Sequence, residues 1–295
     1  MVSLKKKYIN GKTYYYLAHS YRKNKKVNKK EKYIGKKIPK NIDELKEELI
    51  LELYEEIWFK QFDNIKNNFV KEKKKIPKSV GKKEIEHFAI KFTYATNRIE
   101  GSTLTYRETA LLLEKGITPS RRPIEDVKET EKHKQVFYEM LSYKKEINLS
   151  TLLFWHKKLF EETKKDQAGK IRDHSVSISG SRYNPPYAIE LELLLTGFFD
   201  WYKKIRNKLH PVYLAALVHL KFVSIHPFGD GNGRISRLFM NYVLNKNGHP
   251  MIVIDYSDRN SYYNALERSQ LTKDDSIFVL WFFKRYLKEY NKYLK

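Results

Sequence analysis

The sequence predicts a mainly α-helical protein preceded by a small antiparallel β meander. Apolar residues recur at intervals of three and four from Ile42 onward, as on one face of a helix. Helix-start and helix-stop signals punctuate the chain from about residue 79 to its end. The first 38 residues instead hold β-prone aromatic runs separated by turn residues. We therefore expect a basic, aromatic β module over residues 1–38, a helical linker over 40–78, and a helical domain over 79–295.

The N-terminal module has the pattern of a three-stranded meander. Residues 5–9 precede Asn10-Gly11, the strongest short hairpin signal in the sequence. Residues 14–22 form a second β-prone run, a lysine-rich turn follows at residues 23–26, and a third run ends at Gly35.

The linker is predicted to be one long amphipathic helix. Asn41 has the residue type of an N-cap, and acidic residues follow in the first turn. Helical spacing of apolar residues extends to about Asn67. The lysine run at 71–75 and Pro77 are expected to break this helix.

The helical domain has readable boundaries. Glu100-Gly101 is a plausible helix end, and Thr105 to Glu108 form a capping box that opens the next helix. Pro123 and Pro211 each stand where a first-turn proline belongs. The helix that begins at Pro211 leads directly to His226.

Composition restricts the classes of protein. At 295 residues and 41% hydrophobic content the chain can bury a sizeable core. It has no cysteine, no apolar run of the ~20 residues that span a bilayer and no signal peptide, so we expect a cytoplasmic protein without a membrane partner. The net charge of +23 favours polyanionic partners. The alternative is that the lysines are mostly solvated and reflect a genome rich in lysine codons or adaptation to heat, because the excess of positive charge is spread along the chain.

The segment that carries chemistry is residues 226–237, HPFGDGNGRISR. Its glycines let backbone N–H groups converge ahead of a helix that begins near Arg234, which makes an anion site suited to phosphate. Arg237 lies on the same helix face as Arg234 and can also bind phosphate oxygens. Asp230 offers a hard oxygen ligand for Mg²⁺, and His226 is a base that titrates near neutrality. Together these groups predict a phosphoryl-type transfer site.

This segment resembles the signature of the Fic family, His-x-Phe-x-Asp/Glu-Gly-Asn-Gly-Arg-x-x-Arg, and matches every specified position. The resemblance covers about residues 85–290 and implies a Fic-type helical bundle that transfers AMP from ATP to a protein hydroxyl. It implies that His226 is the general base and that Asp230 holds Mg²⁺ or Mn²⁺. The resemblance further assigns the distal phosphates to Arg237, and the anion cradle to Gly231, Asn232, Gly233 and Arg234. The presence of Gly233 and Arg237 favours the nucleotidyl-transferring branch over the phosphate-transferring Doc branch.

Two further segments are similar to functional parts of that family. Residues 169–186 resemble its flap, a β-hairpin whose edge pairs with an extended target peptide. Apolar and polar residues alternate in Val176, Ser177, Ile178 and Ser179, and this alternation predicts a half-exposed strand. An ordinary surface hairpin is the alternative. Tyr262 and Tyr263 stand where the family lines the nucleotide base and would flank adenine, although either also fits the core of a helix.

An upstream segment resembles the family's inhibitory pattern, Ser/Thr-x-x-x-Glu-Gly/Asn. Thr96, Glu100 and Gly101 match it, on a helix expected near residues 86–101. The resemblance implies that Glu100 pairs with Arg237 and keeps that arginine from the γ-phosphate, so that ATP binds unproductively. In some relatives the same glutamate aligns water for removing AMP. The alternative is a capped helix end with a solvated glutamate.

The N-terminal module supports a second hypothesis. Aromatic side chains interleaved with cations can stack on bases and contact phosphates, which would make the chain a nucleic-acid-associated regulator. The module could equally dock protein targets, bind a second copy of the chain or simply cover the helices. The aromatic residues are Tyr14, Tyr15, Tyr16 and Tyr21, and the cations around them include Lys5–Lys7, Lys23, Lys25, Lys26, Lys29 and Lys30.

The sequence therefore predicts a self-inhibited protein adenylyltransferase that uses ATP and Mg²⁺ or Mn²⁺ on a protein substrate, with the chain itself among the candidates. Removal of AMP and transfer of another nucleotide stay open. The apolar stripe of the linker needs a partner surface, so a homodimer is open as well.

Overall fold

The structure is a computed structural model that describes residues 2–23 and 26–294. The centre of the predicted turn, Asn24-Lys25, lies outside the described residues. The chain divides into two compact units, one formed by the residues up to Ile65 and the other by Lys66–Tyr293. The boundary falls inside helix α2 (Lys60–Lys75).

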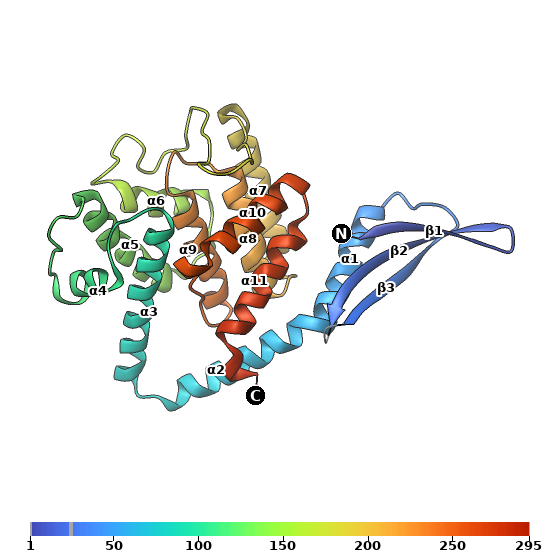
Figure 1. The fold of residues 1–295 in the computed structure, drawn as a ribbon, viewed down its shortest axis with the longest axis horizontal. Helices are drawn as coiled ribbons and strands as arrows, with labels where there is room; N and C mark the ends of the chain where they lie inside the picture. The colour runs from blue at the N-terminus through green and yellow to red at the C-terminus, as the bar shows by residue number, and fades with distance from the viewer. Residues whose placement is uncertain (1, 24–25, 295) are drawn as a thin grey trace. The chain divides into compact units, whose positions relative to one another are not determined.

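The first unit is the predicted meander, covered on one side by a helix. Strands β1 (Ser3–Ile9), β2 (Lys12–Lys23) and β3 (Lys26–Gly35) pair antiparallel in that order (Figure 1). Asn10 and Gly11, which join β1 to β2, both have positive φ, as a tight hairpin turn requires. The helix α1 (Ile42–Tyr54) supplies Leu49 to a small core. The other members of that core are Val2 and Leu17, with Ile34, Ile42, Leu45 and Ile50 packed against them.

The predicted linker helix is longer than expected and irregular in its middle. After α1 the backbone forms a single π-helical stretch, Glu55–Phe59, and then continues as α2 to Lys75. The expectation that the lysines at 71–75 break the helix was wrong, because cations are favourable at a helix C-terminus. Pro77 does end it, since it is the N-cap of the next helix. Asn41 is at the N-cap position, but its side chain makes no capping hydrogen bond.

The second unit is a helical bundle built around two antiparallel helices, α8 (Pro211–Ile225) and α9 (Asn232–Lys246). In Figure 1 the other helices surround this pair. Helices α3, α5 and α6 contact α9, whereas α7 and α11 contact α8. The remaining bounds are α3 (Lys78–Ile99), α4 (Tyr106–Lys115), α5 (Ile124–Ser142), α6 (Leu149–Phe160), α7 (Leu191–Ile205), α10 (Arg259–Thr272) and α11 (Asp275–Glu289). No helix in the described ranges is both long and apolar enough to cross a membrane.

Most of the predicted helix boundaries are confirmed. Helix α3 ends with Glu100 as its C-cap, and Gly101 follows with φ of 103°. Thr105 and Glu108 form the reciprocal capping box at the start of α4. Pro211 is the first residue of α8, but Pro123 is the N-cap of α5 and stands one position before the predicted one.

The flap, residues 169–186, differs from the β-hairpin that the sequence predicts. It turns at Ser179-Gly180, where the Ser181 N–H donates to the carbonyl of Ile178, but no strand occurs in it among the described residues. Several of its backbone N–H groups donate to other segments instead of to each other. The Glu267 carboxylate on α10, for example, accepts from the N–H of Arg182 at 2.6 Å.

One buried polar residue ties the bundle centre to the chain that follows it. Asn241 on α9 is fully buried, donates to the carbonyl of Ile252 at 3.0 Å and accepts from its N–H at 2.8 Å. This amide therefore satisfies a backbone segment that has no secondary structure of its own.

We expect Asn241→Leu to lower the free energy of unfolding by about 2–4 kcal/mol, because it leaves a buried N–H and carbonyl without partners. Urea denaturation followed by circular dichroism measures the change. Asn207→Leu, at an exposed position, is the control and should change stability by under about 0.5 kcal/mol. Equal loss in both variants would contradict this role for Asn241.

Candidate active site

His226 terminates α8 and presents one ring nitrogen to a cavity. It is the C-cap, with φ of 53°, and its Nδ1 lies 3.2 Å from the carbonyl oxygen of Val223. A carbonyl only accepts, so Nδ1 carries the hydrogen and Nε2 keeps its lone pair. Burial lowers the pKa of His226 below its ordinary value, which keeps the ring neutral at pH 7. The geometry therefore provides a base at Nε2.

The loop after His226 is held closed by Asn232. Its side chain accepts from the N–H of Phe228 at 2.9 Å and donates to the carbonyl of the same residue at 2.8 Å. The buried Phe228 ring stacks on His156 with ring centres 3.9 Å apart. His156 bonds through Nε2 to the carbonyl of Asp230 and through Nδ1 to the N–H of Gly169, each at 2.9 Å. Asn232 thus shapes the phosphate cradle instead of facing open space.

Two glycines of the motif are required by close contacts. Gly231 has φ of 83°, and a Cβ there would lie 2.4 Å from the ring of Phe160. A Cβ on Gly233 would lie 2.2 Å from Oε1 of Glu100 and 3.0 Å from Arg237. Gly233 therefore leaves the space in which a carboxylate from α3 reaches the motif.

Asp230 belongs to a network of four charges. Its carboxylate accepts two bonds of 3.0 Å from Arg234 and lies 2.8 Å from Nζ of Lys164. Glu129 on α5 pairs with both of these cations. Burial would raise the pKa of Asp230, but Arg234 and Lys164 hold it well below its usual range. Arg234, which was predicted to reach phosphate with Arg237, pairs with the carboxylates of Glu129 and Asp230.

Arg237 is the most enclosed charge of the site, at 1% exposure. Its Nη2 lies 2.5 Å from Oε1 of Glu100, and its Nε donates to the Thr96 hydroxyl at 3.1 Å. Nη1 donates to the hydroxyl of Tyr262 at 3.2 Å. Burial would lower the pKa of Arg237, but the Glu100 carboxylate outweighs burial and raises it. The inhibitory pattern, the motif and the base-binding segment thus meet at one guanidinium.

A cavity of about 560 Å³ lies beside His226, a size that accommodates a small ligand. Tyr263 is 43% exposed, whereas Tyr262 is buried and bonds to His219. Both tyrosines line the cavity, but Tyr262 is buried and bonds to Arg237, so Tyr263 has the larger exposed ring surface. Val176 and Ser177 are not among the residues that line the cavity. The lining includes Glu100, Ile178, Ser179, Gly233, Asn264, Glu267 and Gln270.

Arg172 is a residue of the site whose role the sequence did not predict. It is 5% exposed, and its guanidinium donates to the carbonyls of His226, His174 and Pro186 at 2.6–2.9 Å. One side chain therefore fixes both ends of the flap to the catalytic loop. Glu129, His156 and Lys164 were missed as well; a buried acid within the apolar face of α5 is the only sequence signal that points to any of them.

The second unit is a helical bundle with a glycine-rich loop at the start of α9. Residues 146–244 match the model of the Fic/DOC family. A protein adenylyltransferase Fic of Nematostella vectensis is 32% identical over 193 residues, 64% of this chain and 45% of that protein. The corresponding protein of Drosophila grimshawi is 35% identical over 59% of this chain and 36% of that protein.

The solved structures agree in fold. A Fic domain containing signaling protein from Bacteroides thetaiotaomicron superposes with a TM-score of 0.70 and 27% identity, over 79% of this chain and 96% of that one. Fic-1 of C. elegans superposes with a TM-score of 0.71 and 23% identity, over 86% of this chain and 75% of that one. The chain is therefore similar to the Fic/DOC family, with residues 146–244 matching its model. It spans less than half the length of the curated relatives named above.

Buried histidines around the two arginines predict a specific dependence of stability on pH. Burial, reinforced by the nearby Arg234, lowers the pKa of His133 to about 3. Burial likewise lowers the pKa of His219 to about 3 and of His156 to about 4. Each folded-state pKa lies below that of the unfolded chain, near 6.5, so the unfolded state binds more protons between pH 6.5 and 4.

The contribution of these histidines to the free energy of unfolding is therefore fully present above pH 6.5. It falls as pH decreases, by up to about 1.4 kcal/mol per pH unit for each such histidine. Urea denaturation at pH 7.5, 6.0 and 5.0 measures the slope. His133→Gln should make it shallower, whereas replacing the exposed His174 by Gln should not. An unchanged slope in His133→Gln would show that this ring is not neutral when folded.

Proposed function

We propose that the chain is a protein adenylyltransferase whose resting state is inhibited by Glu100. The observation that carries the proposal is the 2.5 Å ion pair between Glu100 and Arg237 in the cavity that His226 lines. The adenylyltransferases to which it is similar support the reaction class. The substrate is a hydroxyl-bearing residue of a protein, and the nucleotide is ATP.

In the proposed reaction the hydroxyl oxygen of the target attacks the α-phosphorus of ATP. A new P–O bond forms, the bond to the β-phosphate oxygen breaks, and pyrophosphate leaves. The Nε2 lone pair of His226 takes the hydroxyl proton. N–H groups at the start of α9 and the side chains of Arg234 and Arg237 favour the negative charge of the phosphates.

The residues present fit a divalent metal such as Mg²⁺ or Mn²⁺. Such ions bind one or two carboxylates together with substrate phosphates, and Asp230 is a carboxylate of low pKa in the loop. The cation now beside it, Lys164, is on a side chain that is 31% exposed and can move aside. The metal would neutralise charge between the α- and β-phosphates.

Inhibition follows from competition for a single guanidinium. Arg237 is enclosed by Thr96, Tyr262 and Glu100, so a γ-phosphate can reach it only where the carboxylate now lies. Two anions at that place repel each other. ATP therefore binds with its phosphates displaced from the in-line position until Glu100 withdraws.

The exposed part of the flap fits an extended target segment. The side chains of Ser177 and Ser179 are exposed, and Ile178 lines the cavity. Backbone groups of this stretch can pair with a target backbone and hold its hydroxyl near His226. Removal of AMP at the same site, with Glu100 orienting water, is the second candidate function, favoured by the position of this carboxylate on the cavity wall.

We expect Glu100→Gly to raise the rate of AMP incorporation on the order of tenfold or more, because Arg237 becomes free for phosphate. Incorporation of labelled ATP into the protein itself or into a lysate measures it, with Mg²⁺ and Mn²⁺ compared. Glu114→Gly, at an exposed position on α4, is the control and should leave the rate unchanged.

Adding His226→Ala to the Glu100→Gly variant should abolish incorporation, because the base is lost. Labelled GTP, UTP and CTP in the same assay test the choice of nucleotide. If Glu100→Gly transfers no nucleotide to any protein, adenylyl transfer is not the function of this chain.

A further inference from the structure

The N-terminal unit carries an open sheet face with its own chemistry. We propose that this face, formed by β1, β2 and β3 on the side away from α1, binds double-stranded DNA by its major groove and flanking phosphates. The proposal does not rest on the function proposed above.

The first observation is where the charge lies. Residues 1–38 contain thirteen lysines and arginines and a single acid, Glu31, a net of +12 within a chain of net +23. About half of the excess therefore lies in the strands and turns of the sheet, whereas residues 39–65 of the same unit carry three lysines and eight acids, a net of −5. A sheet of this charge attracts a polyanion.

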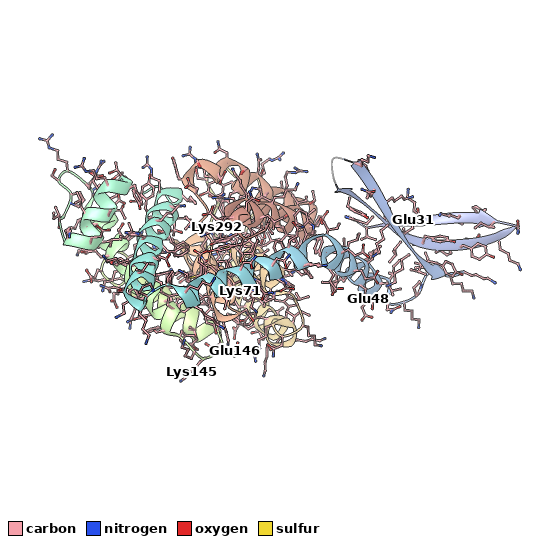
Figure 2. All side chains as sticks on the ribbon, turned by 90° about the horizontal axis from the view of Figure 1, so that it is seen from below. Glu31, Glu48, Lys71, Lys145, Glu146 and Lys292 are labelled. Atoms are coloured by element: carbon pink, nitrogen blue, oxygen red, sulfur yellow. The ribbon has the colours of Figure 1, made fainter. Side chains whose placement is uncertain are left out.

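The second observation is that the two faces of the sheet differ. Leu17 points to α1, and two lysines on its face, Lys30 and Lys32, pair with glutamates of α1 and the π-helical stretch. Residues directly opposite across the strands share a face, and alternate residues along a strand do too. Figure 2 labels Glu31 on the sheet and Glu48, a partner of Lys32, on α1. The charges of Lys30 and Lys32 are thus already compensated, whereas Lys6 and Lys26, which the register places on the same face, are exposed.

The open face combines cations with phenols. The register places Lys5 opposite Tyr16 and Lys7 opposite Tyr14. On the neighbouring strand β3, Tyr33 lies opposite Tyr16 and is 50% exposed. By the same alternation the exposed side chains of Lys12 and Lys29 belong to this face, and Glu31 lies between Lys7 and Lys29. The face therefore offers four lysines and three tyrosine hydroxyls around a single carboxylate.

The packing of the tyrosines favours a duplex over a single strand. Tyr33 lies 6.1 Å from Tyr14 and 5.3 Å from Tyr16, ring centre to ring centre, with rings tilted by 51°. Nζ of Lys7 lies over the ring of Tyr16, 4.4 Å from the ring centre. Bases stack on free, flat ring surfaces, and these rings are engaged with one another and with a cation. Their hydroxyls remain as hydrogen-bond groups for phosphates or base edges.

The dimensions select DNA over RNA. The major groove of B-form DNA is about 12 Å wide and admits a β-ribbon, with adjacent strands spaced about 4.8 Å apart. The major groove of an A-form RNA duplex is too narrow for such a ribbon. The hairpin of β1 and β2 can enter the groove while lysines at its edges reach the phosphates.

The test is fluorescence anisotropy of a labelled 20-base-pair duplex of mixed sequence with the full chain, over 50–200 mM salt. Lys5→Gln combined with Lys12→Gln should raise Kd about tenfold or more. It should also reduce the slope of log K against log salt by about 1.8, because two phosphate contacts are lost. Lys203→Gln with Lys204→Gln, two exposed lysines on α7, removes the same charge elsewhere and should change neither.

A second variant separates loss of contact from loss of folding. Glu31→Gln removes the acid of the open face and should tighten duplex binding about twofold to fivefold, a gain that misfolding cannot produce. A weaker or unchanged affinity in Glu31→Gln overturns the proposal. Equal loss in the two lysine pairs overturns it as well, since binding would then follow total charge alone.

The same experiment distinguishes double-stranded DNA from other ligands of the open face. A single strand or an RNA duplex of equal length that binds tighter than the DNA duplex overturns groove insertion. Binding to vesicles of phosphatidylserine and phosphatidylcholine that is lost in the open-face variant, without binding to the duplex, would assign the face to a membrane. No binding to any duplex at 50 mM salt overturns the proposal outright.

Discussion

The burial of two arginines on one helix is the constraint on which the site depends. Arg234 and Arg237 lie three residues apart on α9 at 4% and 1% exposure, where an uncompensated charge would be strongly destabilising. The bundle therefore brings carboxylates to them, Glu129 and Asp230 to the first and Glu100 to the second. In the proposed function, an entering nucleotide replaces one of these anions with its own phosphate oxygens. The proposed inhibition is thus a consequence of how the fold neutralises its buried cations.

The same constraint explains the histidines. His133 and His219 pack close enough to the arginines that a second positive charge would be repelled, and burial already disfavours their charged forms. His156 meets the loop instead, and its two hydrogen bonds require a neutral ring with hydrogen on Nε2. His226 differs only in that its free nitrogen faces the cavity. Neutral imidazoles thus surround the cations, and a single one is placed to accept a proton from a substrate.

Local signals predicted much of this structure, and long-range contacts account for what they missed. The motif, the capping box of Thr105 and the Asn10-Gly11 hairpin are each encoded within a dozen residues, so spacing alone predicts them. Glu129 lies 105 residues before Arg234 in sequence, and nothing near either residue specifies the other. Arg172 likewise acts through carbonyls that only the folded flap brings together. The two adjacent tyrosines could not be distinguished, because burial of Tyr262 depends on packing against α8 and α11.

The two units present positive charge to anions in opposite ways. In the helical unit the motif arginines are buried and already paired with carboxylates, so a phosphate gains only the difference between itself and the anion it displaces. On the sheet the lysines are exposed, and Glu31 is the sole acid in residues 1–38. Mobile ions screen exposed charges over about 8 Å at physiological ionic strength, but they screen buried pairs much less. Salt should therefore weaken the anion affinity of the sheet steeply while changing the Glu100–Arg237 competition little, which lets the two proposed activities be separated within one intact chain.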